Sequence, residues 1–325
     1  MNLTNQLDSP DPIFILGIMP RCGTNHLMDL ICLHPEVAPG RSPVKEDLFV
    51  ENSDHLIRYV SDVRASWDPI WGEFPQDIEA DLLRSLGDGL ISFLWADRGC
   101  RLVTKSPSVK NVGRFHQLFP EARLVVLIRD GRSIVQSCID TFGWDFDTAA
   151  HRFSGAASEL LTSFVANGST TECLVVRYED LVTDMQATMI GVLDYAGLAP
   201  DKFDFLAAAA LPVRGSSSHL GPRRTSVHWE PVPKDASFRP LERWRSWDEG
   251  KLARFEWIAG QEARALGYEV TGREVHRTAV HRLLDLRWRA RRGVRRAFYR
   301  LRGRLGPATR PARDRLKMLA KDRDR

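Results

Sequence analysis

PIFILGIMPRCGTNHLMDLICLHP, residues 12–35, is the stretch of sequence that decides the fold. Its first part, 13–17, is a short apolar run of the kind found in the buried strands of a parallel sheet. Pro20 and Gly23 then interrupt the run, because proline cannot donate a hydrogen bond to a sheet and glycine accepts backbone angles that other residues avoid. From Thr24 onward apolar residues recur three or four positions apart. The stretch therefore predicts a strand, a loop and a helix.

The loop between this strand and helix is a candidate anion site. The first turn of a helix presents unpaired N–H groups and the positive end of the helix dipole, which suits phosphate or sulfate. Arg21 adds a guanidinium, and Thr24 and Asn25 add polar side chains. An ordinary strand-to-helix turn without a ligand is the alternative interpretation. The loop differs from the nucleotide-binding pattern GxxxxGK[ST], since no Lys-Ser or Lys-Thr follows Gly23.

Composition is ordinary for a soluble globular protein, with 325 residues of which 43% are hydrophobic and 27% charged. No run approaches the roughly 18 apolar residues of a membrane span. Residues 1–11 have neither the basic nor the apolar region of a secretory signal, and we expect a flexible N-terminus there. The five cysteines form no CxxC pair, which favours free thiols in a reducing cytoplasm over disulfides or a zinc site.

The charge is distributed unevenly along the chain. Residues 276–325 carry 18 Lys and Arg against 4 Asp and Glu, a net +14, whereas the other 275 residues carry 28 against 38, a net −10. We therefore predict a domain at 12–270 and a basic, partly helical tail at 271–325. Two interpretations of the tail stay open: peripheral contact with an anionic inner membrane surface or another acidic partner, and a solvated basic arm.

Strands alternate with helices along the domain. Apolar runs predict strands at 13–17, 101–104, 122–128 and 173–177, and helical spacing predicts helices at 52–65, 76–96, 108–119, 133–140 and 251–266. This alternation predicts a three-layer α/β fold, with a central parallel sheet flanked by helices and ligands at the carboxyl ends of the strands. The side chains just past those ends are three cations and a phenol, which together favour a polyanion site: Arg21, Lys105, Arg129 and Tyr178.

Three segments resemble the sulfotransferases that use 3′-phosphoadenosine 5′-phosphosulfate (PAPS). Residues 20–25, Pro-Arg-Cys-Gly-Thr-Asn, resemble that family's 5′-phosphosulfate loop, usually Pro-Arg/Lys-Ser-Gly-Thr-Thr. Residues 129–137 resemble its 3′-phosphate segment, an Arg and a Ser eight positions apart. Residues 176–181, Val-Arg-Tyr-Glu-Asp-Leu, match the strand and turn that follow. The resemblance covers roughly residues 12–270 and implies a P-loop-like fold.

The resemblance also implies an activity and a donor site. The activity is in-line transfer of a sulfuryl group from PAPS to an acceptor hydroxyl, with 3′-phosphoadenosine 5′-phosphate (PAP) as the product. The 3′-phosphate is expected on Arg129 and Ser137. The other implied donor contacts are Arg21, Cys22, Gly23, Thr24, Asn25, His26, Tyr178, Arg214 and Ser217.

Some of these positions depart from the family pattern or have a second interpretation. Cys22 replaces the usual Ser of the phosphosulfate loop, and Asn25 replaces the second Thr. His26 stands where the cytosolic branch stacks a Trp on adenine, so stacking, helix capping and simple packing all stay open. Arg214 and Ser217 lie in a polar loop that in the family often closes over the 3′-phosphate, with a flexible loop as the alternative.

The expected catalytic residues are Glu46, Arg21 and Lys105. Cations aimed at the leaving phosphate lower the barrier, which suits Arg21 and Lys105. The cytosolic branch takes the acceptor's proton with the His of Lys-Thr-His, and the corresponding residues 105–107 are Lys-Ser-Pro. The tyrosylprotein and Golgi glycan branches instead use a Glu in a Lys-Glu-x-x-Phe-like segment, which residues 45–49 resemble. This resemblance makes Glu46 the expected general base, with Asp47 as the second choice.

Two rival functions come from other classes: a nucleotide kinase of related fold, and a non-catalytic anion-binding module that works through the basic tail. The sulfotransferase hypothesis requires no metal, and no clustered set of metal ligands is seen in the sequence. The acceptor is expected to be a small molecule, lipid or glycan with a hydroxyl, and no nucleic-acid partner is expected. Trp67, Trp71 and Phe74 either line a substrate mouth or simply pack in the fold.

Overall fold

The computed structural model divides into two compact units, Met1–Gly272 and Arg273–Arg325. It describes residues 11–41, 44–68, 70, 72–95, 99–166, 173–212, 239–270, 279–290 and 293. In the second unit, residues 279–290 are helical. Within the described residues, no helix combines the length and the apolar character needed to span a bilayer.

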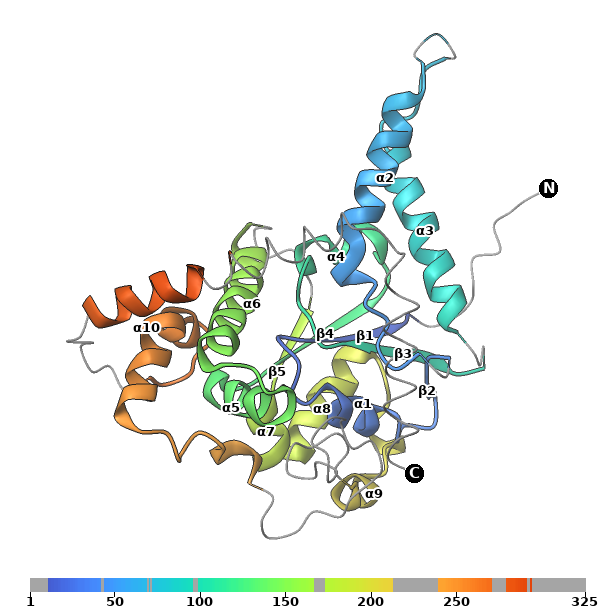
Figure 1. Cartoon of the computed structure of the whole chain (residues 1–325). Helices are drawn as coiled ribbons and strands as arrows, with labels where there is room; N and C mark the ends of the chain where they lie inside the picture. The colour runs from blue at the N-terminus through green and yellow to red at the C-terminus, as the bar shows by residue number, and fades with distance from the viewer. Residues whose placement is uncertain are drawn as a thin grey trace, which may run out of the picture. The chain divides into compact units, whose positions relative to one another are not determined.

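The first unit is built on a parallel sheet of five strands in the order β2-β3-β1-β4-β5 (Figure 1). The strands are β1 (Ile13–Gly17), β2 (Val37–Pro39), β3 (Arg101–Ser106), β4 (Arg123–Ile128) and β5 (Cys173–Arg177). The sheet confirms the predicted α/β class. The sequence missed β2, because three residues are too few to show a pattern, and Pro39 is tolerated there because β2 lies at the edge of the sheet.

The central strand β1 sets the register of its neighbours. Ile15 pairs with Lys105 of β3 on one side and with Val125 of β4 on the other. Since all strands run in parallel, their carboxyl ends lie along one edge of the sheet. β3 continues two residues beyond the predicted end at 104, because Leu16 of β1 still pairs with Ser106. Lys105 therefore belongs to the strand itself and does not lie past its end.

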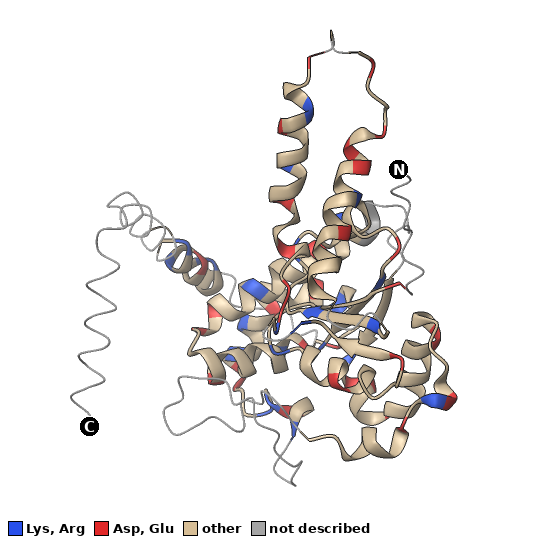
Figure 2. Cartoon of the chain, turned by 90° about the vertical axis from the view of Figure 1, so that its right-hand side faces the viewer, with Lys and Arg blue, Asp and Glu red and all other residues tan. Residues whose placement is uncertain are grey.

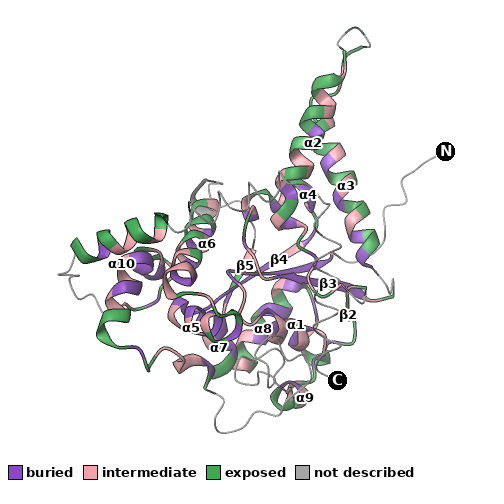
Figure 3. Cartoon of the chain, in the orientation of Figure 1, coloured by how far each residue is buried: buried purple, intermediate pink, exposed green. Residues whose placement is uncertain are grey.

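Helices flank the sheet and bury it (Figure 3). In Figure 1, α1 and α8 lie on one side of the sheet and α4 lies on the other. The helices are α1 (Thr24–Ile31), α2 (Ser53–Ser66), α3 (Ile78–Leu94), α4 (Phe115–Leu118), α5 (Gly131–Phe142), α6 (Phe146–Ala166), α7 (Tyr178–Thr183), α8 (Met185–Ala196), α9 (Phe205–Ala210) and α10 (Glu249–Ala265). The 3₁₀ turns are η1 (Val50–Asn52), η3 (Val112–Arg114), η4 (Pro200–Lys202) and η6 (Pro240–Glu242).

The helix predicted at 108–119 is wrong. Only η3 and the single turn α4 form there, because Asn111 has a φ of 64°, a left-handed conformation that an α-helix does not accommodate. The Asn111 amide donates a hydrogen bond to the carbonyl of Glu51 at 3.0 Å, which holds this turn against η1. Phe115 and Phe119 then pack on Phe14 of β1, with ring centroids 5.3 and 4.7 Å away.

The helices α2 and α3 project side by side from the sheet and form an arm (Figures 1 and 2). Residues 50–95 carry nine carboxylates and three arginines, a net charge of −6. Trp67 and Phe74 stack on one another at the far end of the arm, with centroids 5.2 Å apart, and the Arg64 guanidinium lies 4.7 Å from the Phe74 ring centre. The structure thus shows packing for Trp67 and Phe74, whereas Trp71 lies outside the described residues.

Candidate functional site

The loop from β1 to α1 has a backbone conformation that only certain residues tolerate. Gly23 has a φ of 112°, in the left-handed region that favours glycine, and a Cβ at this position would lie 2.4 Å from the ring of Tyr178. Arg21 also has a positive φ of 79°. The chain therefore turns sharply enough to point the N-terminus of α1, the positive end of its helix dipole, at the carboxyl edge of the sheet.

The β1 and β4 strands form the topological switch point of the sheet. The chain leaves β1 toward β3 and β2, and leaves β4 toward β5 on the opposite side. In open parallel sheets, ligands bind in the crevice outside the carboxyl ends of the strands at this point. The helices α1 and α5 begin just after these two strands, and both therefore direct a positive dipole end toward the same place.

The structure brings together the residues that were predicted for the two anion sites. The Arg21 Nε donates to the Ser137 hydroxyl of α5 at 3.2 Å. The Arg129 Nη1 donates to the Arg21 carbonyl at 2.7 Å, and the Arg129 guanidinium lies 4.4 Å from the ring centre of Tyr178. The two loops thus form one continuous site, although they lie more than a hundred residues apart in the sequence.

The site carries buried positive charge without a matching carboxylate. Burial, reinforced by the nearby charge of Arg129, lowers the pKa of the Arg21 guanidinium. Among the described residues, no carboxylate forms an ion pair with Arg21 or Arg129, although Arg129 is almost completely buried. The Arg129 Nε is also buried without a hydrogen-bond partner. A buried cation is costly unless it is paired, so this arrangement favours an anionic ligand.

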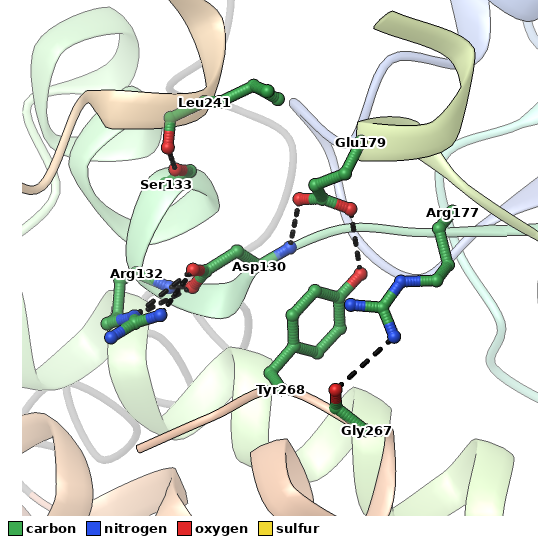
Figure 4. A network of polar contacts seen from close by, with 8 residues as sticks. All are labelled: Asp130, Arg132, Ser133, Arg177, Glu179, Leu241, Gly267 and Tyr268. Carbon is green, nitrogen blue, oxygen red and sulfur yellow. Dashed lines mark hydrogen bonds and ion pairs between the residues drawn. The ribbon is translucent and has the colours of Figure 1, made fainter. Parts of the chain in front are cut away.

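A polar network fixes the backbone around Arg129 (Figure 4). The Glu179 carboxylate accepts hydrogen bonds from the Asp130 backbone N–H at 2.9 Å and from the Tyr268 hydroxyl at 3.0 Å. Arg177 lies over the Tyr268 ring at 4.2 Å and donates to the Gly267 carbonyl at 3.3 Å. Glu179 therefore ties the start of α7 to the start of α5, which gives the Tyr-Glu-Asp-Leu segment a structural role. Sequence patterns missed this network because its partners are distant along the chain.

The start of α5 is stabilised by its own cap. Asp130 is the N-cap residue and accepts from the Arg132 backbone N–H at 2.8 Å. The Arg132 guanidinium also pairs with the Asp130 carboxylate at 2.7 Å and lies 3.8 Å from the ring centre of Trp244. These contacts hold the first turn of α5 in place and thereby orient Ser137 two turns further along the helix.

Glu46 and Lys105 lie together at the same edge of the sheet. The Lys105 Nζ is 3.3 Å from Glu46 Oε1. The Lys105 side chain is 5% exposed and that of Glu46 is 35% exposed, so the carboxylate lies on the open side of the pair. This placement leaves the Glu46 carboxylate accessible to an acceptor molecule, which a general base requires. Their catalytic roles remain predictions.

Asp47 has a different environment from Glu46. It is buried, and its two carboxylate oxygens accept from the Thr104 hydroxyl and from the Phe49 backbone N–H, both at 2.8 Å. Burial raises the pKa of the Asp47 carboxyl. Asp47 therefore fastens its segment to β3, which leaves Glu46 as the carboxylate that faces outward.

The remaining predicted donor contacts are placed as follows. Cys22 is fully buried under the loop, where burial raises the pKa of its thiol, and its backbone N–H donates to the Met19 carbonyl at 3.2 Å. Thr24 and Asn25 begin α1. The His26 ring meets the edge of Tyr178 with centroids 6.5 Å apart, a packing contact. Arg214 and Ser217 lie outside the described residues.

Sequence reasoning missed one cation of this site, Arg243. It follows η6 directly, and the Pro240 carbonyl of η6 accepts a hydrogen bond from Arg129 Nη2. Burial, together with the positive charges of Arg129 and Arg21, lowers the pKa of Arg243 to about 10. No local pattern marks it, because only tertiary folding brings this segment against α5.

Metal ligands do not cluster in the described part of the chain. No group of three or more His, Cys, Asp or Glu side chains there is placed to hold a metal ion.

A parallel α/β sheet with two cationic loops at its switch point, each at the start of a helix, is typical of α/β proteins that bind anionic ligands. The comparison with protein families specifies the class further. Residues 12–202 match the family described as the sulfotransferase family, and since this match spans more than half of the chain, the chain belongs to that family. The resemblance seen in the three sequence segments is thereby confirmed.

Individual relatives are distant. The chain is 25% identical over 204 residues to protein-tyrosine sulfotransferase A of Caenorhabditis elegans. The aligned region covers 58% of this chain and 51% of that protein. It is 23% identical over 202 residues to protein-tyrosine sulfotransferase 2 of Gallus gallus, with 58% and 52% covered. The chain thus spans about half the length of these curated relatives.

A solved structure shares the fold. The sulfotransferase domain from the Synechococcus PCC 7002 olefin synthase superposes with a TM-score of 0.50 at 20% identity, covering 80% of this chain and 96% of that domain. At this identity the likeness concerns the fold alone.

Proposed function

We propose that this protein transfers a sulfuryl group from PAPS to an acceptor hydroxyl. The observation that carries the proposal is the junction of Arg21, Arg129 and Ser137 at the switch point of a sulfotransferase-family sheet, where neither arginine forms an ion pair with a carboxylate of the described residues. Such a junction suits a donor with two anionic groups joined by a nucleoside, because each loop serves one of them.

The donor's groups are assigned to the two loops. The N-terminus of α1 and Arg21 hold the 5′-phosphosulfate, and Arg129 and Ser137 hold the 3′-phosphate. Both loops are fixed before the donor arrives: Arg129 is bonded to the Arg21 carbonyl, and Glu179 clamps Asp130. Because the hydrogen-bonding groups of both loops are already in position, little reorganisation is needed during the reaction.

The transfer itself is a displacement at sulfur. The acceptor oxygen forms a bond to sulfur, the bond between sulfur and the bridging phosphate oxygen breaks, and PAP leaves with the electron pair. Glu46 takes the acceptor's proton, while Lys105 and Arg21 stabilise the charge that gathers on the departing phosphate. The 3.3 Å contact between Lys105 and Glu46 supports this division of roles, since the ammonium and the carboxylate lie side by side.

The acceptor is proposed only as a hydroxyl-bearing molecule. The curated relatives are named for tyrosyl proteins, and small-molecule, lipid and glycan hydroxyls suit the same chemistry. A screen that incubates labelled PAPS with fractionated cell extract identifies the acceptor by the labelled product.

The basic C-terminal unit is proposed to make peripheral contact with an anionic membrane surface on the cytoplasmic side. Residues 279–290 form a helix that exposes three apolar side chains spaced three apart, Val280, Leu283 and Leu286. Arg282, Arg287 and Arg289 are exposed on the same helix. Exposed apolar side chains combined with a net charge of +14 over residues 276–325 suit an interfacial basic helix.

The test of the donor is calorimetry with PAP and with 5′-AMP. PAP should bind far better than 5′-AMP or ATP, because only PAP supplies the 3′-phosphate. Arg129→Ala should cost ~1.5–3 kcal/mol of PAP binding, the scale of hydrogen bonds to charged groups. Because Arg129 also holds the Arg21 carbonyl, Ser137→Ala serves as a milder second variant with the same direction of effect. Equal affinity of the wild type for PAP and 5′-AMP contradicts the proposal.

Removal of divalent metal ions with EDTA distinguishes a sulfotransferase from a nucleotide kinase. Sulfuryl transfer should continue in excess EDTA, because cationic side chains and backbone amides take the role that magnesium has in kinases. The measurement is product formation before and after chelation, with magnesium added back as the control. Complete loss that magnesium restores, together with ATP turnover, identifies a nucleotide kinase instead.

A further inference from the structure

We propose that the far end of the α2–α3 arm docks the protein that carries the acceptor hydroxyl, and that this protein presents a basic surface around an apolar pocket. The far end is residues 62–81, from the last turns of α2 to the first turn of α3. The inference rests on the proposed function, because it specifies the acceptor for the same site. It assigns a role to a segment that includes none of the donor contacts.

The far end of the arm is acidic (Figure 2). Residues 62–81 contain six carboxylates and a single basic side chain, Arg64, a net charge of −5. The six carboxylates are all exposed: Asp62, Asp68, Glu73, Asp77, Glu79 and Asp81. Among the described residues none of them forms an ion pair, and the Arg64 guanidinium faces the Phe74 ring instead. Such a charge repels nucleic acids and anionic membranes and complements a basic protein surface.

An exposed apolar side chain lies at the same end of the arm. Ile70 is 84% exposed, among the most exposed large apolar side chains of the described residues. It belongs to the connection between α2 and α3, and the stack of Trp67 on Phe74 joins the two ends of that connection. An aliphatic side chain with charged neighbours has the composition of a protein interface, which combines an apolar centre with a polar rim.

The base of the arm is fixed next to Glu46. Asp47 fastens the segment to β3 through its buried carboxylate. The Glu51 carbonyl, one turn before α2, accepts hydrogen bonds from the Lys110 ammonium at 2.9 Å and from the Asn111 amide at 3.0 Å. A protein bound to the arm is therefore held in a defined position relative to Glu46, which favours transfer to a hydroxyl that this protein carries.

The length of the arm indicates the size of its ligand. α2 has 14 residues, which at 1.5 Å per residue makes it about 21 Å long. Figure 1 shows the far end of the arm well away from the sheet, whereas Glu46 precedes the near end of α2 in the chain. A molecule that contacts the far end while its hydroxyl lies beside Glu46 must span a distance of this order. A protein surface spans it, and a small-molecule acceptor does not.

The chain supplies matched variants for the test. The arm triple variant combines Asp62→Asn, Glu73→Gln and Asp81→Asn. These three carboxylates take no part in the hydrogen bonds or ion pairs of the described residues. The control triple variant removes three exposed carboxylates outside the arm, through Glu121→Gln, Asp194→Asn and Glu269→Gln. Ile70→Ser removes the apolar side chain without a change of charge. All variants should melt close to the wild-type temperature, because the altered side chains are exposed.

The first experiment asks which fraction of a cell extract receives the sulfuryl group from labelled PAPS. The extract is separated by dialysis into small molecules and proteins, and the proteins are divided on a cation exchanger. The wild type and the control triple variant should label proteins that the exchanger retains. The arm triple variant should label them about tenfold more slowly at low salt, the combined scale of three exposed ion pairs. Label confined to the dialysable fraction, or to proteins that the exchanger does not retain, overturns the inference.

The second experiment measures binding and needs no transfer. One fluorescent probe is a peptide of lysine and leucine, the other a peptide of equal charge made of lysine and serine, and anisotropy reports binding. The wild type should bind the leucine peptide about tenfold more tightly, and Ile70→Ser should abolish this difference. The arm triple variant and about 0.5 M sodium chloride should each weaken binding of both peptides. The control triple variant should bind as the wild type does.

Failure of the proposed function gives a different pattern from failure of the docking site. If the wild type labels no fraction, sulfuryl transfer is rejected, and the peptide measurement alone decides on the arm. Equal peptide binding by the wild type and the arm triple variant, or by the wild type and Ile70→Ser, rejects docking whatever the reaction is. A sedimentation coefficient that changes only in the arm triple variant identifies a second copy of this chain as the occupant, which also overturns the inference.

Discussion

Glu46→Gln should lower turnover by about 10²- to 10⁴-fold, the usual contribution of a general base, and should leave PAP affinity close to that of the wild type. Glutamine keeps the shape of the side chain and its contact with Lys105, but it cannot accept the acceptor's proton. Glu46 lies on the open side of its 3.3 Å pair with Lys105. Turnover by product formation and PAP affinity by calorimetry together check this result.

The control for Glu46 is the adjacent carboxylate. Asp47→Asn should mainly lower stability, since Asp47 is buried and accepts from the Thr104 hydroxyl and the Phe49 N–H. If Glu46→Gln turns over normally and folded Asp47→Asn is inactive, the base is Asp47. If both variants turn over normally, the base lies elsewhere and the resemblance to the Glu-dependent branches is misleading on this point.

Lys105→Met should lower turnover by about 10²- to 10³-fold, the scale seen when one donor to a developing negative charge is removed. The Lys105 side chain is 5% exposed and pairs with Glu46, and methionine fills a similar volume without the charge. The effect should appear in kcat more than in KM, because the charge on the leaving phosphate is greatest in the transition state. Steady-state kinetics with PAPS as the varied substrate make the measurement.

The chain provides a second lysine for comparison. Lys110 is 51% exposed, donates to the Glu51 carbonyl at 2.9 Å and pairs with Asp54 at 3.6 Å, away from Glu46. Lys110→Met should keep kcat within a factor of about two, since exposed ion pairs contribute little. A Lys105→Met variant that raises KM with kcat unchanged contradicts the catalytic role and leaves only ground-state binding for this lysine.

Much of the site could be predicted from the sequence, because each of its loops is formed by residues that are close together in the chain. A buried parallel strand must be apolar along its length, so residues 13–17 and 123–128 are visible as runs. The turn after β1 needs a residue that tolerates a φ of 112° beside the Tyr178 ring, so Gly23 marks it. The eight-residue spacing of Arg129 and Ser137 spans two turns of α5, which is why one short segment supplies both.

Other features were decided only by the tertiary structure. Asn111 ends a helical pattern because its left-handed conformation is held by the carbonyl of Glu51, sixty residues earlier in the chain. Glu46 and Asp47 are equivalent as adjacent carboxylates in the sequence, and packing against β3 buries one and exposes the other.

The position of Arg243 at the site could not be predicted from the sequence either. The sequence around it is rich in Arg and Trp, and nothing local places it near Arg21. It lies near Arg129 because η6 is held against β4 and α5 by hydrogen bonds to its backbone carbonyls. Every residue has such a carbonyl, so these contacts cannot be predicted from side-chain patterns. Periodicity thus predicted the strands other than β2, and the resemblance of three segments indicated the family, while the charges that meet across the fold depended on packing between segments distant in the chain.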